Sequence, residues 1–155
     1  TDDDGRTGAA PLTEVIHAHG HEHVSAEHQS TFEVTTDDWL TPAGDCILAI
    51  EADRAPESYD AAFVEACQET EATITAQLTV AASADDRAAH VESVTGSGHP
   101  ELTFESDRSL VCRTSSHVDD RTVMTEADVA AVEVDRELVD ALATGADLEL
   151  RLSVA

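Results

Sequence analysis

The sequence contains no lysine, few aromatic residues and no long apolar run. Aromatic residues make up only 3% of the chain, so a core has to be built from alanine, valine, leucine and isoleucine. No apolar run approaches the roughly 18–20 residues that a membrane-spanning helix needs. All eight basic residues are arginine, against 33 acidic residues, whereas a nucleic-acid-binding surface is normally basic. The composition therefore argues against membrane and nucleic acid as partners.

Familiar catalytic and cofactor motifs are missing as well. The chain has neither of the glycine-rich phosphate-binding patterns, GxGxxG and GxxxxGK[ST], and it has no HExxH or GxSxG. Schiff-base chemistry on lysine is excluded. The three cysteines, Cys46, Cys67 and Cys112, form no CxxC pair and are odd in number, so neither a disulfide framework nor a zinc ribbon is predicted.

The formal net charge of −25 is spread along the 155 residues rather than gathered in one tail. General solubility and cation binding are two explanations; adaptation to molar salt is the third and the one we favour. At about 1 M salt the Debye length is about 3 Å, so repulsion between surface carboxylates is largely screened. The first residues show no basic start or apolar segment typical of a secretion signal. We therefore predict a halophilic, cytoplasmic protein with a disordered acidic leader over residues 1–11.

An internal repeat is the most informative feature of the sequence. A shift of 78 residues places Gly20-His21 on Gly98-His99, and a shift of 75 places residues 51–53 on the identical Glu-Ala-Asp of residues 126–128. The small change in offset requires only short deletions in loops. We expect two tandem repeats, residues 12–82 and 83–155, that share one core within a single domain, with an acidic turn at residues 83–88 between them.

Apolar periodicity predicts that each repeat is rich in strands and has one short helix. Alternating segments indicate about ten strands, among them residues 12–18, 22–28, 31–36, 46–52, 72–80, 89–96 and 146–154. A period of 3.6 residues predicts helices over residues 56–69 and 135–143. The fold class is therefore mainly β, with a β-sandwich or barrel-like body.

Five of the eight histidines lie within twelve residues, and four of them alternate: His17, His19, His21 and His23. An uninterrupted strand would project all four from one face, where two imidazoles at i and i+2 can share a divalent transition metal. Gly20 is expected to bend that strand. His17, His19 and His21 are thus the candidate metal ligands, and a polar, histidine-rich edge is the alternative.

A second candidate site combines a histidine, an aspartate and a thiol. His28 shares its parity with the apolar residues Val24 and Ala26, so its ring is expected to face inward. Asp45 and Cys46 end a turn that enters a buried strand. Together the three residues could form a catalytic site with the Cys46 thiolate as nucleophile, His28 as base and Asp45 as orienting carboxylate. A neighbouring imidazolium would then lower the pKa of Cys46. Alternatively, Asp45 only ties the turn and Cys46 is a small buried apolar residue.

Two motifs resemble an archaeal family known as domain of unknown function 371. They read Gly20-His21-x-x-Val24-x-Ala26-x-His28-x-x-Thr31-x-Glu33-Val34-Thr35 and Leu40-Thr41-Pro42-x-Gly44-Asp45-Cys46-Ile47. The resemblance extends from about Glu14 to Val154. It implies an archaeal origin and a jelly-roll-like β-sandwich, but no activity. The motif positions it carries over as site residues are His21, His28, Thr31, Asp45 and Cys46.

Three classes of function follow from these patterns. The first is an enzyme acting on a small polar molecule, with His21, His28, Thr31, Asp45 and Cys46 as catalytic residues in the first repeat. The second is a non-catalytic module that binds a small ligand, a metal or a protein. The third is an RNA-associated factor, which should concentrate its few arginines on one face. An enzyme should hold His28, Asp45 and Cys46 in one pocket, whereas a binding module should hold them apart.

Overall fold

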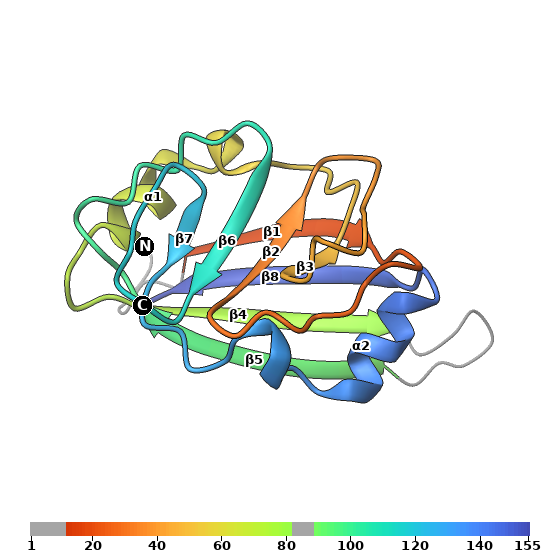
Figure 1. Cartoon of the computed structure of the whole chain (residues 1–155). Helices are drawn as coiled ribbons and strands as arrows, with labels where there is room; N and C mark the ends of the chain where they lie inside the picture. The colour runs from red at the N-terminus through yellow and green to blue at the C-terminus, as the bar shows by residue number, and fades with distance from the viewer. Residues whose placement is uncertain (1–11, 82–88) are drawn as a thin grey trace.

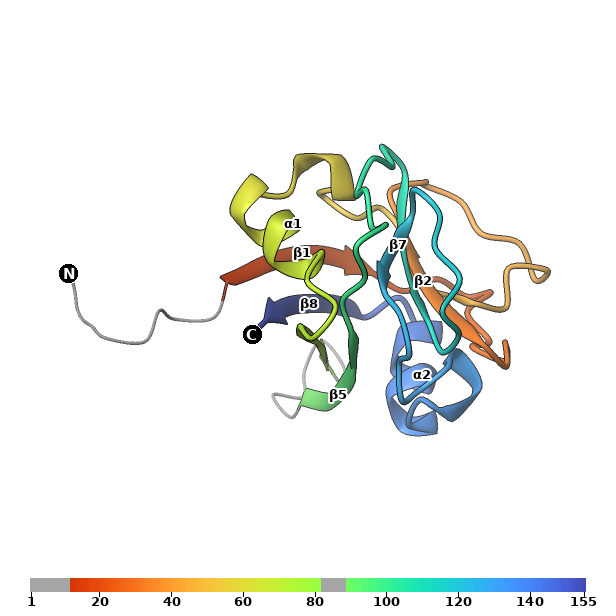
Figure 2. The same ribbon diagram turned by 90° about the vertical axis from the view of Figure 1, so that its left-hand side faces the viewer.

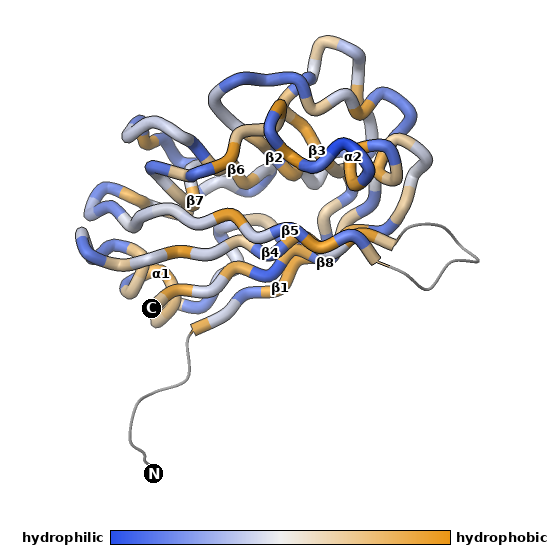
Figure 3. The backbone as a smooth tube through the Cα atoms, turned by 90° about the horizontal axis from the view of Figure 1, so that it is seen from below, coloured by the Kyte–Doolittle hydropathy of each residue, from blue (hydrophilic) through white to orange (hydrophobic). Residues whose placement is uncertain are grey.

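The computed structural model describes residues 12–81 and 89–155, which form two facing four-stranded sheets with a short helix towards each end (Figure 1). The mainly β fold predicted from the sequence is confirmed. The predicted leader, residues 1–11, and the predicted turn at residues 83–88 lie outside the described residues. Figure 3 shows the two sheets as separate layers.

The first sheet is antiparallel throughout and has the strand order β1-β8-β4-β5. Its strands are β1 (Leu12–His19), β8 (Asp147–Val154), β4 (Thr73–Ala81) and β5 (Ala89–Ser97). Strict alternation builds this sheet: along β4, every second residue is fully buried and the residues between them face solvent. One face therefore contributes to the core and the other stays open to water.

The second sheet is mixed and has the order β3-β2-β6-β7. It consists of β3 (Ile47–Ala49), β2 (Thr31–Thr35), β6 (Ser109–Arg113) and β7 (Thr122–Met124). The central pair β2–β6 is antiparallel, whereas β2–β3 and β6–β7 are parallel. These parallel pairs differ from the all-antiparallel arrangement of a jelly roll. Several outward residues of this sheet are also buried, Thr35 and Val111 among them, and the others are half-buried.

Two helical regions close the sandwich at opposite ends (Figure 2). The single helix predicted over residues 56–69 divides into a 3₁₀ turn, η1 (Pro56–Ser58), and a helix, α1 (Ala61–Cys67), because Tyr59 and Asp60 have extended backbones. The helix predicted over residues 135–143 agrees closely with α2 (Arg136–Ala143), which follows the 3₁₀ turn η2 (Ala131–Glu133).

The strand predicted over residues 22–28 is wrong, because this segment is a loop. Ala26 has a left-handed backbone with φ of 50°, which a strand does not allow. The alternation that suggested a strand reflects burial alone, since Val24 and Ala26 both lie in the core. The described residues accordingly form eight strands rather than about ten.

The order of elements in residues 12–81 recurs in residues 89–154: three strands, a 3₁₀ turn, a helix and a strand. Exchanging β1 with β5, β2 with β6, β3 with β7 and β4 with β8 leaves the strand order of both sheets unchanged. The two segments are interleaved, because β8 lies between β1 and β4. Helix α1 likewise contacts both β1 and β8. Neither segment could therefore bury its apolar surface by itself.

Candidate functional site

The loops before β2 and β3 bring the backbones of three predicted site residues together. The carbonyl oxygen of Asp45 accepts the N–H group of His28 at 3.2 Å, and the carbonyl of Cys46 accepts the N–H of Glu33 at 2.8 Å. Thr31 lies at the same place, with its hydroxyl 3.2 Å from the Nδ1 atom of His28. His28, Thr31, Asp45 and Cys46 thus share one region of the fold.

The ring of His28 closes a turn. Its Nδ1 atom accepts the backbone N–H groups of Ser30 and Thr31, each at 3.2 Å. This use of the Nδ1 lone pair places the proton of the neutral ring on Nε2. A general base needs a free lone pair, and in this arrangement the available one already holds the chain in its turn.

His21 also closes a turn, and its counterpart in the second segment does the same. The Nδ1 atom of His21 accepts the N–H of His23 at 3.0 Å, and that of His99 accepts the N–H of Glu101 at 3.0 Å. The ring of His21 lies 5.1 Å from the ring of His23, measured between centroids. These contacts of His21 are made within its own turn, at the end of β1.

Gly20 and Gly98 precede these two histidines. A glycine is required at both positions because the backbone there lies close to the end of a helix. A Cβ atom at Gly20 would lie 1.8 Å from the carbonyl oxygen of Leu142 in α2, and one at Gly98 would lie 2.3 Å from that of Cys67 in α1. Real Cβ atoms do not approach backbone atoms this closely. The Gly-His pair is therefore a packing and turn motif, which explains its presence in both segments without any chemistry.

Cys46 is a poor nucleophile where the structure places it. Its Sγ donates a weak hydrogen bond to Oε1 of Glu33 at 3.4 Å. Burial, followed by the nearby negative charges of Glu33 and Asp45, raises the pKa of Cys46 to about 11. The expected lowering of this pKa is therefore wrong. Glu33 belongs to the motif quoted above but was not predicted as a site residue; it alternates with the buried residues of β2 and so shares the outward face with the thiol.

A chain of ion pairs continues from Glu33 along the same face. Arg121 places Nη1 3.8 Å from Glu33 and Nη2 3.2 Å from Asp119, which also pairs with Arg113 at 2.8 Å. Burial would raise the pKa of Asp119, but the N–H of Arg121, both guanidinium groups and the hydroxyl of Thr122 outweigh it and lower the pKa to about 2. This carboxylate stays ionised and fixes both arginines.

The arginines around β6 and β7 are thus neutralised by carboxylates. Arg108, just before β6, makes a bidentate contact with Asp37 at 2.7–3.1 Å, and Asp119 holds Arg113 and Arg121. A phosphate backbone is bound by basic groups whose charge is available. Three of the eight arginines lie here, whereas Arg54, Arg136 and Arg151 lie on other elements, so the concentration on one face that an RNA-associated factor would require is not seen among the described residues.

The candidate metal ligands have other partners. His17 lies between Asp53 at 3.5 Å and Glu149 at 3.6 Å. Both ring nitrogens of His19 are engaged, by Glu51 at 2.7 Å and the carbonyl of Gly20 at 2.8 Å. The hydrogen bond with Glu51 is the main reason that the pKa of His19 is raised. Across residues 12–81 and 89–155, no three His, Cys, Asp or Glu side chains are grouped so that they could hold a metal.

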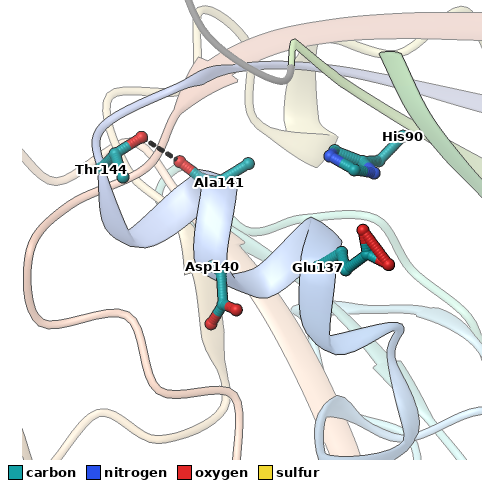
Figure 4. Close-up of a pocket in the computed structure, with 5 residues that line it drawn as sticks. All are labelled: His90, Glu137, Asp140, Ala141 and Thr144. Atoms are coloured by element: carbon teal, nitrogen blue, oxygen red, sulfur yellow. Dashed lines mark hydrogen bonds between the residues drawn. The ribbon is translucent and has the colours of Figure 1, made fainter. Parts of the chain in front are cut away.

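An open pocket of about 330 Å³ lies between β5 and α2, away from the predicted residues (Figure 4). It is lined by His90, Glu137, Asp140, Ala141 and Thr144. Figure 4 shows His90 and Glu137 on the same side of the helix, while the carboxylate of Asp140 points away from His90. The hydroxyl of Thr144 donates to the carbonyl of Ala141 at 2.6 Å. No pattern in the sequence marked these residues as a site.

The fold and its site define a small two-sheet β protein in which His21 and His28 close turns and the described pocket is acidic. The chain belongs to the family described as "Domain of unknown function (DUF371)", whose model matches residues 16–155. It is 32% identical over 140 residues to the "Uncharacterized protein MJ0206" of Methanocaldococcus jannaschii, covering 90% of this chain and 98% of that relative. In the described residues, no helix has the length and apolarity to cross a membrane.

Proposed function

We propose that this protein is a non-catalytic binding module whose ligand is a small organic cation, held in the pocket between β5 and α2. The observation that carries the proposal is the joint exposure of His90, Glu137 and Asp140 to one pocket. A volume of about 330 Å³ lies at the small end of the range of ligand pockets.

The charge of the pocket determines the kind of ligand. Glu137 and Asp140 are exposed carboxylates one helical turn apart on α2. The last turn of α2 carries no basic side chain, although the carbonyl groups at a helix C-terminus favour a positive charge. A primary ammonium group could pair with the carboxylate of Glu137 while its carbon chain lies against Ala141, and Asp140 would add negative charge nearby. His90 would then provide a second polar contact.

The first segment lacks this combination, which makes it a natural control. The positions that correspond to His90 and Glu137 under the repeat offsets are Leu12 and Ala62, whereas Glu65 on α1 corresponds to Asp140. A ligand that needed only diffuse negative charge would bind at either helix. A ligand that needs the pocket should bind at α2 alone.

Titration with 1,4-diaminobutane at constant ionic strength, followed by amide NMR shifts, tests this proposal. We expect saturable shifts at His90, Glu137 and Thr144. Glu137→Gln should weaken binding roughly fivefold, as the loss of one exposed ion pair of about 1 kcal/mol implies. The matched variant Glu65→Gln changes the net charge equally and should leave the affinity unchanged. Equal effects of the two variants, or shifts that never saturate, would show diffuse attraction and overturn the proposal.

A catalytic site at His21, His28, Thr31, Asp45 and Cys46 is the second candidate function. The closeness of the His28 and Asp45 backbones and the Cys46–Glu33 contact support it. The engaged Nδ1 of His28 and the raised pKa of Cys46 weigh against it. If the Cys46→Ser variant catalysed every reaction that the wild-type protein is found to catalyse, and at the same rate, Cys46 would be excluded as a nucleophile and this catalytic site would be abandoned.

We further infer that residues 12–82 and 83–155 arose by duplication and form one domain. Matching hydrogen bonds support this: Asp53 accepts the N–H of His17 in the first segment, and Asp128 accepts that of Thr95 in the second, both at 2.9 Å. Before each helix, a strand carboxylate accepts an N–H at the N-cap, Glu14 from Asp60 and Glu92 from Asp135.

The composition of the chain also supports a proposal about its habitat. The dispersed acidic residues and the absence of lysine support a halophilic archaeal origin and a cytoplasmic location.

A further inference from the structure

One half of the outer face of the first sheet, formed by β4 and β5, is unlike the rest of this acidic molecule. The outward residues of β4 and β5 alternate with the buried core positions and pair across the two strands, as Gln77 does with Ser93 and Thr79 with Val91. The ten positions are Thr73, Thr75, Gln77, Thr79, Ala81, Ala89, Val91, Ser93, Thr95 and Ser97. Every one of them is uncharged.

This composition is unexpected for the chain. Acidic residues make up 33 of its 155 residues, about one in five, so ten positions chosen without regard to exposure would hold about two. Strand geometry alone does not exclude them, because the neighbouring strand β8 presents Asp147 and Glu149 on the same face. Val91, with 56% of its surface exposed, is a large apolar residue left in solvent on this face.

The two sheets also differ in how they are covered. Several outward side chains of the second sheet are buried, with Thr35 at 1% and Ser109 and Val111 at 2% exposure, and the others, such as Glu33, are half-buried. On the first sheet, Gln77 and Thr95 are exposed. A flat sheet face without charges matches the fully buried core of protein interfaces, which is depleted of charged residues.

We propose that this face, formed by the outward residues of β4 and β5, is the interface of a homodimer. The charge of the partner decides between possible occupants. A basic partner would bind to the acidic surface that this protein has elsewhere. An uncharged face gives such a partner no electrostatic attraction. A partner that itself carries a large negative charge can approach closely only where acidic residues are absent. A second copy of this chain, with a net charge of −25, is such a partner.

The size of the face fits a weak dimer. Two strands about 4.8 Å apart and nine residues long form a face of about 10 Å by about 30 Å. Packing two such faces would bury on the order of 600 Å² in total, which is below the size of a stable specific interface and typical of a weak, reversible one. A dissociation constant on the order of 100 μM is therefore expected. It should decrease as salt rises, because the acidic surfaces around the face repel one another until they are screened.

Sedimentation velocity of the full chain over a concentration series in 0.2 M and 2 M KCl tests the proposal. We expect the wild type to dimerise more strongly at 2 M. Gln77→Glu places a carboxylate at the centre of the face and should weaken the dimer at least tenfold, since opposed like charges cost several kcal/mol. Gln29→Glu makes the same chemical change in an exposed loop and is the matched control. Circular dichroism would establish that both variants keep the fold.

Three outcomes would overturn the inference. The wild type could remain monomeric up to about 1 mM in both salts. A dimer that weakens as KCl rises would indicate attraction between opposite charges. A dimer that tolerates Gln77→Glu, or that Gln29→Glu weakens equally, would place the contact elsewhere, for example along the free edge of β5. Loss of the dimer in Gln77→Glu alone supports the face.

Discussion

His28 and Ser106 make the same hydrogen bonds in the two segments of the chain. The Nδ1 atom of His28 accepts the N–H groups two and three residues further on, those of Ser30 and Thr31, each at 3.2 Å. The Oγ atom of Ser106 accepts those of Arg108 and Ser109, at 3.1 and 3.2 Å. An imidazole and a hydroxyl thus close equivalent turns before β2 and β6.

Substituting His28 separates this turn-closing role from catalysis. His28→Ala should destabilise the fold by about 1 kcal/mol, because two backbone N–H groups lose their acceptor. His28→Ser should recover most of that loss, as serine already makes these bonds at position 106. Urea denaturation at fixed pH measures both. If the serine variant were as unstable as the alanine variant, the equivalence would not hold.

The thiol of Cys46 should react slowly near neutral pH. With a pKa of about 11, only about one thiol in a thousand is ionised at pH 8. Alkylation by iodoacetamide should therefore accelerate about tenfold per pH unit between pH 7.5 and 9.5, without a plateau. Cys67 and Cys112 should react more slowly still, because both are buried and each has a pKa raised to about 12.

Glu33→Gln tests the cause of that high pKa. Removing the carboxylate beside the thiol should lower the pKa of Cys46 and speed alkylation severalfold at pH 8. Glu27→Gln, an exposed substitution in the loop that meets Asp45, is the control. A rate plateau near pH 8.5 in the wild type would contradict both expectations.

Asp119 should make the free energy of unfolding depend on pH in the acidic range. Its pKa is lowered from 3.8 to about 2, so its contribution is fully present above about pH 4 and is lost as the pH falls through about 2. Asp119→Asn should cost about 1–2 kcal/mol at pH 7, a figure reduced for the partial exposure of the carboxylate. Most of the difference from the wild type should be lost by about pH 2. A difference that stays constant over this range would exclude linkage to this carboxyl group.

Gly20→Ala should destabilise the protein by about 3 kcal/mol or more, because the added methyl group would overlap the carbonyl of Leu142. Gly145→Ala provides the comparison. That glycine has φ of +92° and open space around it, so alanine there meets only backbone strain of about 1–2 kcal/mol. Thermal denaturation of both variants distinguishes steric overlap from strain. Equal losses would argue against the close approach.

Salt dependence tests the interpretation of the charge. The melting temperature should rise between 0.1 M and 2 M KCl, as repulsion within a chain of net charge −25 is screened. A melting temperature that stays flat or falls would remove the argument for a halophilic habitat.

The sequence predicted the elements whose periodicity is long and regular. Residues 72–80 and 146–154 were expected to be strands and correspond to β4 and β8, and α2 begins one residue after its expected start. The loop at residues 22–28 was misjudged because burial in a loop can also alternate. The parallel pairs β2–β3 and β6–β7 depend on long-range contacts that no local pattern encodes.

The candidate site shows a different limit of sequence analysis. Residue types suggested which side chains could do chemistry, but not whether their lone pairs were free. His21 and His28 each accept backbone N–H groups, and this depends on the path of the turn, which is set by three-dimensional packing. The pocket around His90 joins two elements more than forty residues apart and left no local signal.

The interleaving of the two segments has a consequence for biosynthesis. Strand β1 forms its ladder only with β8, in a register that pairs Leu12 with Val154. During translation, β1 therefore emerges with no strand to pair with until almost the whole sequence has been synthesised. Closing so long a loop is entropically slow, and an unpaired strand invites pairing with other chains. Strand β1 must wait for β8, so its residues should depend most on whatever protects a nascent chain from aggregation.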